Sequence, residues 1–198
     1  MKRLGLGWVF VWLGCLAAQA VVPGSGNAGA YRALLAGKKV GLAANHTAVV
    51  GEMHTVDFLR GQGIEVVRLF CPEHGFRGDA DAGATVGDAT DPKTGLPVIS
   101  LYGKKKKPSP ADLQGIEVMV FDMQDVGVRF YTYLSTLHYV MEACAEQDIP
   151  LVVMDRPNPN AFYTDGPILE KQHASFVGMH PVPIVYGMTI GEYARMIN

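Results

Sequence analysis

The sequence predicts an α/β fold: a Rossmann-like, mostly parallel sheet with helices on both faces. Short apolar runs alternate along the 198 residues with segments of helical periodicity. The runs are almost continuously apolar, which is typical of parallel strands that are covered on both faces. Polar residues follow directly where these runs end. Because open α/β sheets bind ligands outside the carboxyl ends of their strands, a site is expected along this edge.

Each expected strand is a short apolar run bounded by Gly, Pro or a polar residue. The strands are predicted at residues 39–44, 64–71, 96–101, 117–121 and 151–154. Helices are predicted from apolar spacing or from a capping residue at residues 53–62, 109–113, 131–147 and 189–197. Ser109 and Thr189 are the expected N-caps, and Glu192 completes a capping box with Thr189. Residues 75–95 are expected to form a long loop that is functional or mobile.

Composition and motifs exclude several functions. The net charge of −2 and the lack of clustered cations predict no nucleic-acid partner. The one basic run, residues 104–107, lies between Gly103 and Pro108 and is interpreted as a solvated loop. No G-x-G-x-x-G follows the first strand and no Walker A loop is present, so dinucleotide or phosphate binding is unsupported.

The N-terminus has the pattern of a targeting segment. Lys2 and Arg3 precede a short apolar run, and Ala18-Gln19-Ala20 is a small-x-small cleavage signal. The run is too short for a stable membrane span. We expect a signal peptide at residues 1–20, cleavage after Ala20, and export to the periplasm or the extracellular space. Lipidation at Cys15 is the less favoured alternative, and residues 21–37 are expected to be a leader.

Export would permit disulfides, and the mature chain would keep Cys71 and Cys144. Two buried thiols are slightly preferred over a bridge between them. The sequence does not give the Cα separation that would decide between the two.

Pro72-Glu73-His74-Gly75 follows the second predicted strand and is the sharpest local feature. A carboxylate and an imidazole are therefore adjacent where the strand ends, and Gly75 allows the backbone to turn. A carboxylate at such an edge can serve as a general acid. Glu73 is therefore the candidate acid, with a loop-fixing hydrogen bond as its alternative. His74 is expected either to bind substrate or to hold the loop.

A second polar group follows the fourth predicted strand. Successive side chains of a strand point to opposite faces, so Asp122 and Gln124 are expected on one side of the strand end and Asp125 on the other. Arg129 can clamp a substrate carboxylate through two parallel hydrogen bonds. Tyr131 offers an apolar face with a polar tip, which suits a sugar. The alternative is a buried ion pair among core aromatics; it is slightly favoured for Asp122, whereas a site is favoured for Gln124, Asp125 and Arg129.

Asn158 lies between two prolines after the fifth predicted strand, and the prolines present its amide on a stiff loop. Asn45 occupies the corresponding place after the first strand. A metal site formed by His74, Asp122 and Asp155 is a weaker alternative, because no H-x-x-x-H or C-x-x-C spacing supports it. The prediction is therefore no metal and no other cofactor.

Several long motifs occur in order from about residue 38 to the last residue. They are FCPEHGFRGDADAG, DPKTGLPVISLYG, VFDMQDVGVRFYTYLSTL, VVMDRPNP, DGP and SFVGMHPVPIVYGMTIGEYA. Together they resemble the exo-β-N-acetylmuramidase family of bacterial peptidoglycan hydrolases, of the NamZ type. Members of this family remove a terminal N-acetylmuramic acid from the non-reducing end of cell-wall glycan fragments.

The resemblance implies a Rossmann-like N-terminal catalytic domain at residues 38–198. In the family a smaller C-terminal domain follows, with the cleft between the two, so the chain is expected to be a truncated member without that second domain. The family's catalytic glutamate in P-E-H-G corresponds to Glu73, and its Q-D-V-G-x-R-F-Y-T-Y block corresponds to residues 124–133. The sequence departs from the family at Tyr186, where a His is usual.

The sequence as a whole predicts an exported glycoside hydrolase, an exo-acting β-N-acetylmuramidase whose substrate is a peptidoglycan-derived glycan. Glu73 is the predicted general acid. Asp125 is favoured over Asp122 and Asp155 as the second carboxylate, although the substrate's own acetamido group could replace it. Arg129 is the candidate partner for the lactyl carboxylate. The predicted substrate-binding residues are His74, Gln124, Arg129, Tyr131, Asn158 and Asn45. The alternatives are a non-catalytic glycan-binding module and, less favoured, a metal-assisted hydrolase.

Overall fold

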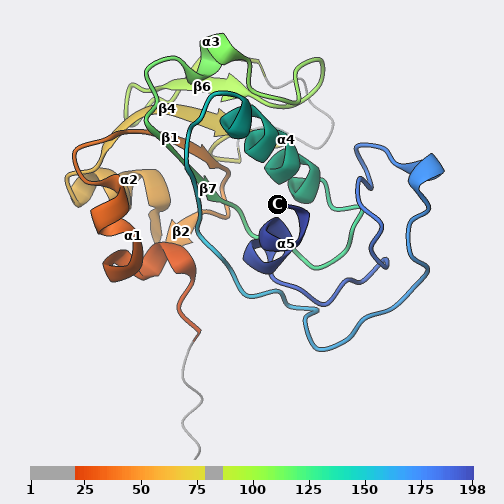
Figure 1. The fold of residues 1–198 in the computed structure, drawn as a ribbon. Helices are drawn as coiled ribbons and strands as arrows, with labels where there is room; N and C mark the ends of the chain where they lie inside the picture. Colours follow the sequence, from red (N-terminus) through yellow and green to blue (C-terminus); the bar gives the residue numbers. More distant parts are fainter. Residues whose placement is uncertain (1–20, 79–86) are drawn as a thin grey trace, which may run out of the picture.

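The computed structural model describes residues 21–78 and 87–198. A six-stranded sheet runs through the centre of these residues, in the order β5-β6-β4-β1-β7-β8 (Figure 1). Every neighbouring pair in this sheet is parallel except β5 and β6, which confirms the mostly parallel α/β fold. The strands are β1 (Lys39–Ala44), β4 (Glu65–Cys71), β5 (Ala89–Thr90), β6 (Pro97–Ser100), β7 (Val118–Asp122) and β8 (Leu151–Val153).

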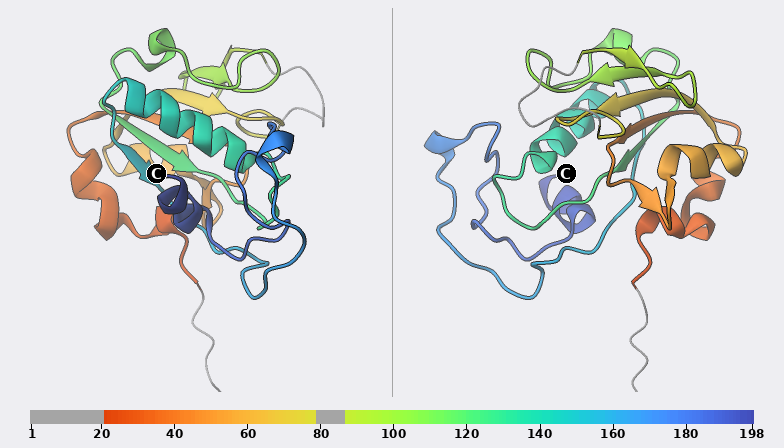
Figure 2. Two further views of the ribbon diagram at one scale, coloured as in Figure 1. Left: turned by 45° about the vertical axis from the view of Figure 1, so that its right-hand side comes forward. Right: turned by 180° about the vertical axis from the view of Figure 1, so that it is seen from behind.

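Helices cover both faces of the sheet, as predicted (Figure 2). On one face α1 (Ala28–Leu35) and α2 (Thr55–Gly61) bury their apolar side chains against the sheet. On the other face α4 (Tyr133–Glu146) and α5 (Ile190–Ile197) form a second core, to which Leu113 of α3 (Pro110–Leu113) contributes. Within the described ranges, no helix combines the length and the apolar character that a membrane crossing requires.

The predicted elements lie within a few residues of the observed ones, and both expected caps are confirmed. Ser109 and Thr189 each form a capping box with the acidic residue three positions on. The helix predicted from residue 53 begins instead at Thr55, because Met53–His54 is a short strand, β3, paired with β2 (Val49–Val50). His54 then acts as the N-cap, its ring nitrogen accepting a hydrogen bond from Val56 N at 3.3 Å.

The segment predicted as a leader, residues 21–37, is a folded part of the domain, so that prediction is wrong. It contains a 3-10 helix, η1 (Gly24–Gly26), followed by α1. Tyr31 and Leu35 lie four positions apart on α1 and are both buried against the sheet. Gly24 N also donates to Asp155 O at 2.6 Å, which ties this segment to the end of β8. The predicted signal peptide, residues 1–20, lies outside the described residues.

The predicted loop at residues 75–95 is more ordered at its ends than expected. Residues 79–86 lie outside the described part of the chain. After them, β5 pairs antiparallel with β6. Arg77 donates from Nε and Nη2 to the two carboxylate oxygens of Asp91, at 2.6 and 2.9 Å. The guanidinium holds the pKa of Asp91 at about 2, well below its ordinary value, so this ion pair fixes both ends of the loop.

Cys71 and Cys144 are both buried, as the preferred interpretation expected. Cys71 belongs to the core under α1 and α2, and Cys144 to the core under α4 and α5. The two thiols therefore lie on opposite faces of the sheet, and they form no disulfide with each other.

Candidate active site

Glu73 follows β4 in a tight turn at the carboxyl edge of the sheet. Gly75 N donates to Pro72 O at 3.4 Å, and His74 adopts a φ of 71°. A residue other than glycine in this left-handed region is uncommon and marks local strain, which is often stored at functional sites. The turn leaves Glu73 half-buried at the edge where the sequence predicted it.

A tyrosine from the neighbouring strand holds the Glu73 carboxylate. Tyr102 comes two residues after β6, which lies beside β4, and its hydroxyl donates to Glu73 Oε1 at 3.2 Å. Tyr102 was not predicted as a site residue, although its position at a strand end is visible in the sequence. The missing information was the strand order, which brings the ends of β4 and β6 together.

Tyr133 in the first turn of α4 is a second functional candidate that was not predicted from the sequence. It is 3% exposed, and this burial raises the pKa of its hydroxyl. The Tyr131 hydroxyl and the Glu73 charge raise this pKa further, whereas the Asn45 side chain lowers it. The structure therefore brings four groups together at this edge: Glu73, Tyr131, Tyr133 and Asn45.

Asn45 supplies a buried hydrogen-bond donor in this group. Its Oδ1 accepts from Thr47 N at 3.0 Å and from Thr47 Oγ1 at 2.6 Å. Its Nδ2 is buried and makes no hydrogen bond of normal geometry with the described residues. A buried amide donor that lacks a partner lowers the stability of the fold. Such a donor at the end of a strand is therefore suited to bind an acceptor atom of a ligand.

Gln124 connects three strand ends. Its backbone N donates to Thr47 Oγ1 at 2.9 Å, which joins the loops after β1 and β7. Its Nε2 donates to Asp125 O at 2.6 Å and to Pro157 O at 2.8 Å, which joins the loop after β8. In this geometry both amide hydrogens of Gln124 are used to hold the loops around the site.

Asp125 is almost completely buried, with 2% of its surface exposed. Burial raises its pKa, while hydrogen bonds from the Tyr186 hydroxyl and from Gly127 N (2.7 Å) act in the opposite direction. Both of these bonds reach Oδ2, and Oδ1 has no hydrogen-bond partner among the described residues. Asp125 thus fastens the turn after β7 to Tyr186, and it keeps one carboxylate oxygen that can accept a proton or a ligand donor.

Arg129 and Asn158 hold the loops beside Asp125. Arg129 Nη1 donates to Pro167 O at 2.6 Å and to Val182 O at 2.7 Å. Asn158 Nδ2 donates to Met188 O at 2.8 Å, and its Oδ1 accepts from Asn160 N. Gly127, with a φ of 78°, packs so closely on Asn158 that a Cβ there would overlap its amide. These contacts fix the long connection between β8 and α5, which swings out from the sheet in Figure 2.

Asp122 and Asp155 are used inside the fold. Asp122 is fully buried and forms an ion pair with Arg156, whose Nε lies 2.6 Å from Oδ1. Asp155 accepts from Thr189 Oγ1 and Gly191 N at the start of α5. The metal site considered for His74, Asp122 and Asp155 is not assembled: among the residues described, no group of three His, Cys, Asp or Glu side chains could hold a metal ion.

These features define a class of protein. The chain is an α/β domain with a half-buried glutamate, tyrosine hydroxyls and a buried amide gathered at the carboxyl edge of a parallel sheet. The model of the family described as exo-β-N-acetylmuramidase NamZ, N-terminal, matches residues 40–198. The chain belongs to this family.

Similar proteins agree with this assignment. Peptidoglycan β-N-acetylmuramidase NamZ of Bacillus subtilis (strain 168) is 51% identical over 171 residues, which are 85% of this chain and 41% of that protein. Crystal structures of two DUF1343 family proteins from Bacteroides fragilis NCTC 9343 match with TM-scores of 0.79 and 0.82, at 43% and 41% identity. The matches cover 89% of this chain but only 46% and 45% of theirs, so the chain spans less than half the length of these relatives.

Proposed function

We propose that the chain is the N-terminal catalytic part of an exo-acting β-N-acetylmuramidase that acts on peptidoglycan fragments. The Bacillus subtilis relative carries the name of this activity. The observation that carries the proposal is the position of Glu73. It lies half-buried at the carboxyl edge of the sheet, held by the Tyr102 hydroxyl and close to Tyr133.

Glu73 is proposed to protonate the glycosidic oxygen as the bond to the leaving sugar breaks. The hydrogen bond from Tyr102 fixes the direction of the carboxyl group, which proton transfer requires. The developing positive charge at the anomeric carbon then needs a second group. Asp125 is the proposed second carboxylate, through its Oδ1, and the alternative is the substrate's own acetamido oxygen.

The sugar is proposed to lie against Tyr131 and His74, beside the buried Asn45 amide. Tyrosine rings offer apolar faces to sugar rings. Asn45 Nδ2 is suited to donate to a carbonyl or hydroxyl oxygen of the substrate, because it makes no hydrogen bond of normal geometry with the described residues. Gln124 and Asn158 are proposed to act indirectly, by holding the loops that carry these groups.

The function can be tested with a chimera in which the remaining part of the Bacillus subtilis relative follows Asn198. We expect the chimera to release the chromophore from an aryl β-N-acetylmuramide much faster than from the matched β-N-acetylglucosaminide. The chain by itself should be folded but show little turnover, because its site edge faces water on one side. Substrate binding without turnover by the chimera would instead identify a glycan-binding module. Full turnover by the chain alone would show that this part suffices.

Arg129 is proposed to recognise the lactyl carboxylate that distinguishes N-acetylmuramic acid. Within the described residues only Nη1 of its side chain makes hydrogen bonds, which leaves Nε and Nη2 for a bidentate contact. Arg129→Lys should lower the ratio of muramide to glucosaminide hydrolysis by about tenfold, because an ammonium cannot reproduce the planar fork. Lys93→Arg, a change at an exposed cation that pairs with Asp57, serves as the control. An unchanged ratio for Arg129→Lys would restrict this residue to holding the loops.

We also propose that the protein is exported. Lys2, Arg3 and the apolar run before Ala20 support this, and a peptidoglycan substrate lies outside the cytoplasm. Expression in a bacterium with an intact secretion system should yield a mature protein that begins at Val21. The measurement is the intact mass of the periplasmic or secreted material. A mature mass that includes residues 1–20 would contradict the proposal.

A further inference from the structure

The outer edge of β8 is the feature that the proposed function leaves unexplained. β8 is the last strand of the sheet, and β7 is its neighbour on the inner side only. All three of its residues are partly exposed, whereas every residue of β7 is buried. An apolar strand that is left open at a sheet edge is a template for another strand.

The backbone hydrogen bonds show which groups face outward. Met119 N donates to Pro150 O, and Met154 N donates to Phe121 O, so the even-numbered positions face β7. Because directions alternate along a strand, the N–H and C=O groups of Leu151 and Val153 face outward. Neither residue makes an outward backbone hydrogen bond with the part of the chain that the structure describes. Two residues beyond β8, the outward carbonyl of Asp155 accepts a hydrogen bond from Gly24 N. The same edge therefore forms a backbone hydrogen bond where another segment lies beside it.

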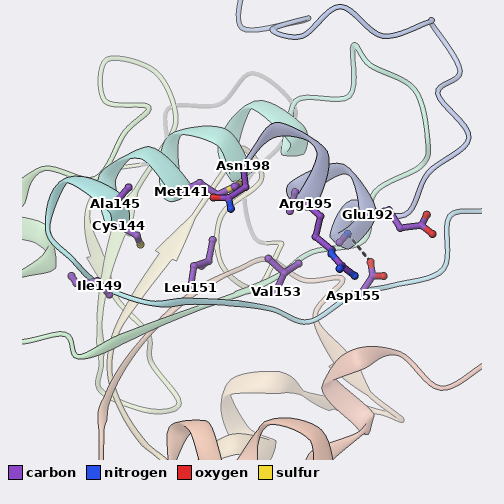
Figure 3. Close-up of a pocket in the computed structure, with 12 residues that line it drawn as sticks. Met141, Cys144, Ala145, Ile149, Leu151, Val153, Asp155, Glu192, Arg195 and Asn198 are labelled. Atoms are coloured by element: carbon purple, nitrogen blue, oxygen red, sulfur yellow. Dashed lines mark hydrogen bonds between the residues drawn. The ribbon is translucent and has the colours of Figure 1, made fainter.

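A cavity of about 560 Å³ lies over this edge, between α4, β8 and α5 (Figure 3). Its apolar lining comes from Met141, Cys144, Ala145, Ile149, Leu151 and Val153. Glu192 and Arg195 of α5 and Asp155 near the start of this helix lie at one end of it, and Asn198 lies beside Met141. The cavity is separate from the candidate active site, because Glu73, Tyr102, Tyr133 and Asn45 do not line it.

The direction of α5 indicates what this space receives. The helix starts at the carboxyl end of β8, where Asp155 accepts hydrogen bonds from Thr189 and Gly191. It then runs back along the same face as α4, and Asn198 at its end lies beside Met141 of α4. A strand, a connection and an antiparallel covering helix are the first parts of a βαβ unit, whose next strand lies parallel beside the first.

We propose that the outer edge of β8 and this cavity receive a parallel strand from the part of the family's proteins that follows the matched region. The relatives extend well beyond that region, since it covers 41–46% of their lengths. Such a strand would bond to the backbone groups of Leu151 and Val153. Its side chains on the α5 face would be large and apolar and would fill the cavity, and this contact would join the two halves of the enzyme into one continuous sheet.

The first test is residue-resolved amide exchange by NMR on the chain itself. The amides of Leu151 and Val153 should exchange fast, while the Val152 amide, which faces β7, should exchange slowly. In the chimera with the remaining part of the Bacillus subtilis relative, the Leu151 and Val153 amides should slow by at least about tenfold. Slow exchange at both positions in the monomeric chain would overturn the proposal without any need for the chimera.

The second test compares two proline variants. Val153→Pro removes one outward N–H from β8, a change that an edge strand tolerates, so it should lower Tm in the chimera and hardly at all in the chain. Thr90→Pro is the matched control on β5, at the opposite edge, and should act equally in both proteins. Equal effects of Val153→Pro in the two proteins would overturn the proposal. So would a dimer of the chain that Val153→Pro dissociates in light scattering, because the occupant would then be a second copy.

Discussion

Glu73→Gln in the chimera is expected to lower the turnover of an aryl β-N-acetylmuramide by roughly 10²–10⁴-fold, the usual contribution of a general acid. Glutamine keeps the shape of the side chain and can still accept the hydrogen bond from Tyr102. It cannot donate a proton to the leaving oxygen, so the loss should appear in kcat rather than in KM. Steady-state kinetics and a calorimetric measurement of sugar binding separate these two parameters.

Glu65→Gln provides a matched control for this change. Glu65 is the first residue of the same strand, β4, and lies exposed at the opposite, amino end of the sheet. Its substitution should leave turnover within about twofold, because it removes a carboxylate far from the carboxyl edge. If Glu73→Gln also keeps its turnover, Glu73 is a loop-fixing residue and the acid must be sought elsewhere.

Asp122→Ala is expected to cause the largest loss of stability, about 3–5 kcal/mol in the free energy of unfolding. Asp122 is fully buried at the end of β7, and Arg156, 5% exposed, donates to both of its carboxylate oxygens. Thr55 adds a third hydrogen bond, at 2.5 Å. Removal of the carboxylate leaves the guanidinium charge buried without a counter-charge. Urea unfolding followed by circular dichroism measures the effect.

Two further variants show whether the ion pair is the cause. Replacement of both partners, Asp122→Leu with Arg156→Met, should cost less than Asp122→Ala alone, because no buried charge is left without a partner. Asp165→Ala, at an exposed aspartate, should change stability by less than about 0.5 kcal/mol. An effect of Asp122→Ala as small as that of Asp165→Ala would show that the pair contributes little.

The long elements were predictable because their physical causes are local. Residues 40–44 are a run of small and apolar residues, and the strand at residues 39–44 was predicted with the bounds that the structure has. Ser109 and Thr189 were recognised because a capping box needs only two residues three positions apart. α1 was missed because its buried side chains, Tyr31 and Leu35, are only two in number and follow a glycine-rich segment.

The candidate site was only partly predictable, since it depends on which strands are neighbours. Glu73 could be found as a polar residue at a strand end and as part of the family motif. Tyr102 could not be linked to it, because their contact requires β6 to lie next to β4. The sequence also cannot distinguish a residue that meets substrate from one that holds a loop. Gln124, whose amide hydrogens are both used within the protein, shows this difference.

The contact between η1 and the end of β8 has a consequence for the order of folding. Arg156 Nη2 donates to Ser25 Oγ at 3.3 Å, a hydrogen bond between residues that are 131 positions apart in the chain. During synthesis the N-terminal segment therefore cannot take its final place until residue 156 has left the ribosome. Contacts of such high sequence separation form late and slow the folding rate. The sheet edge at β8 therefore stays without its N-terminal contact for most of the synthesis of the chain.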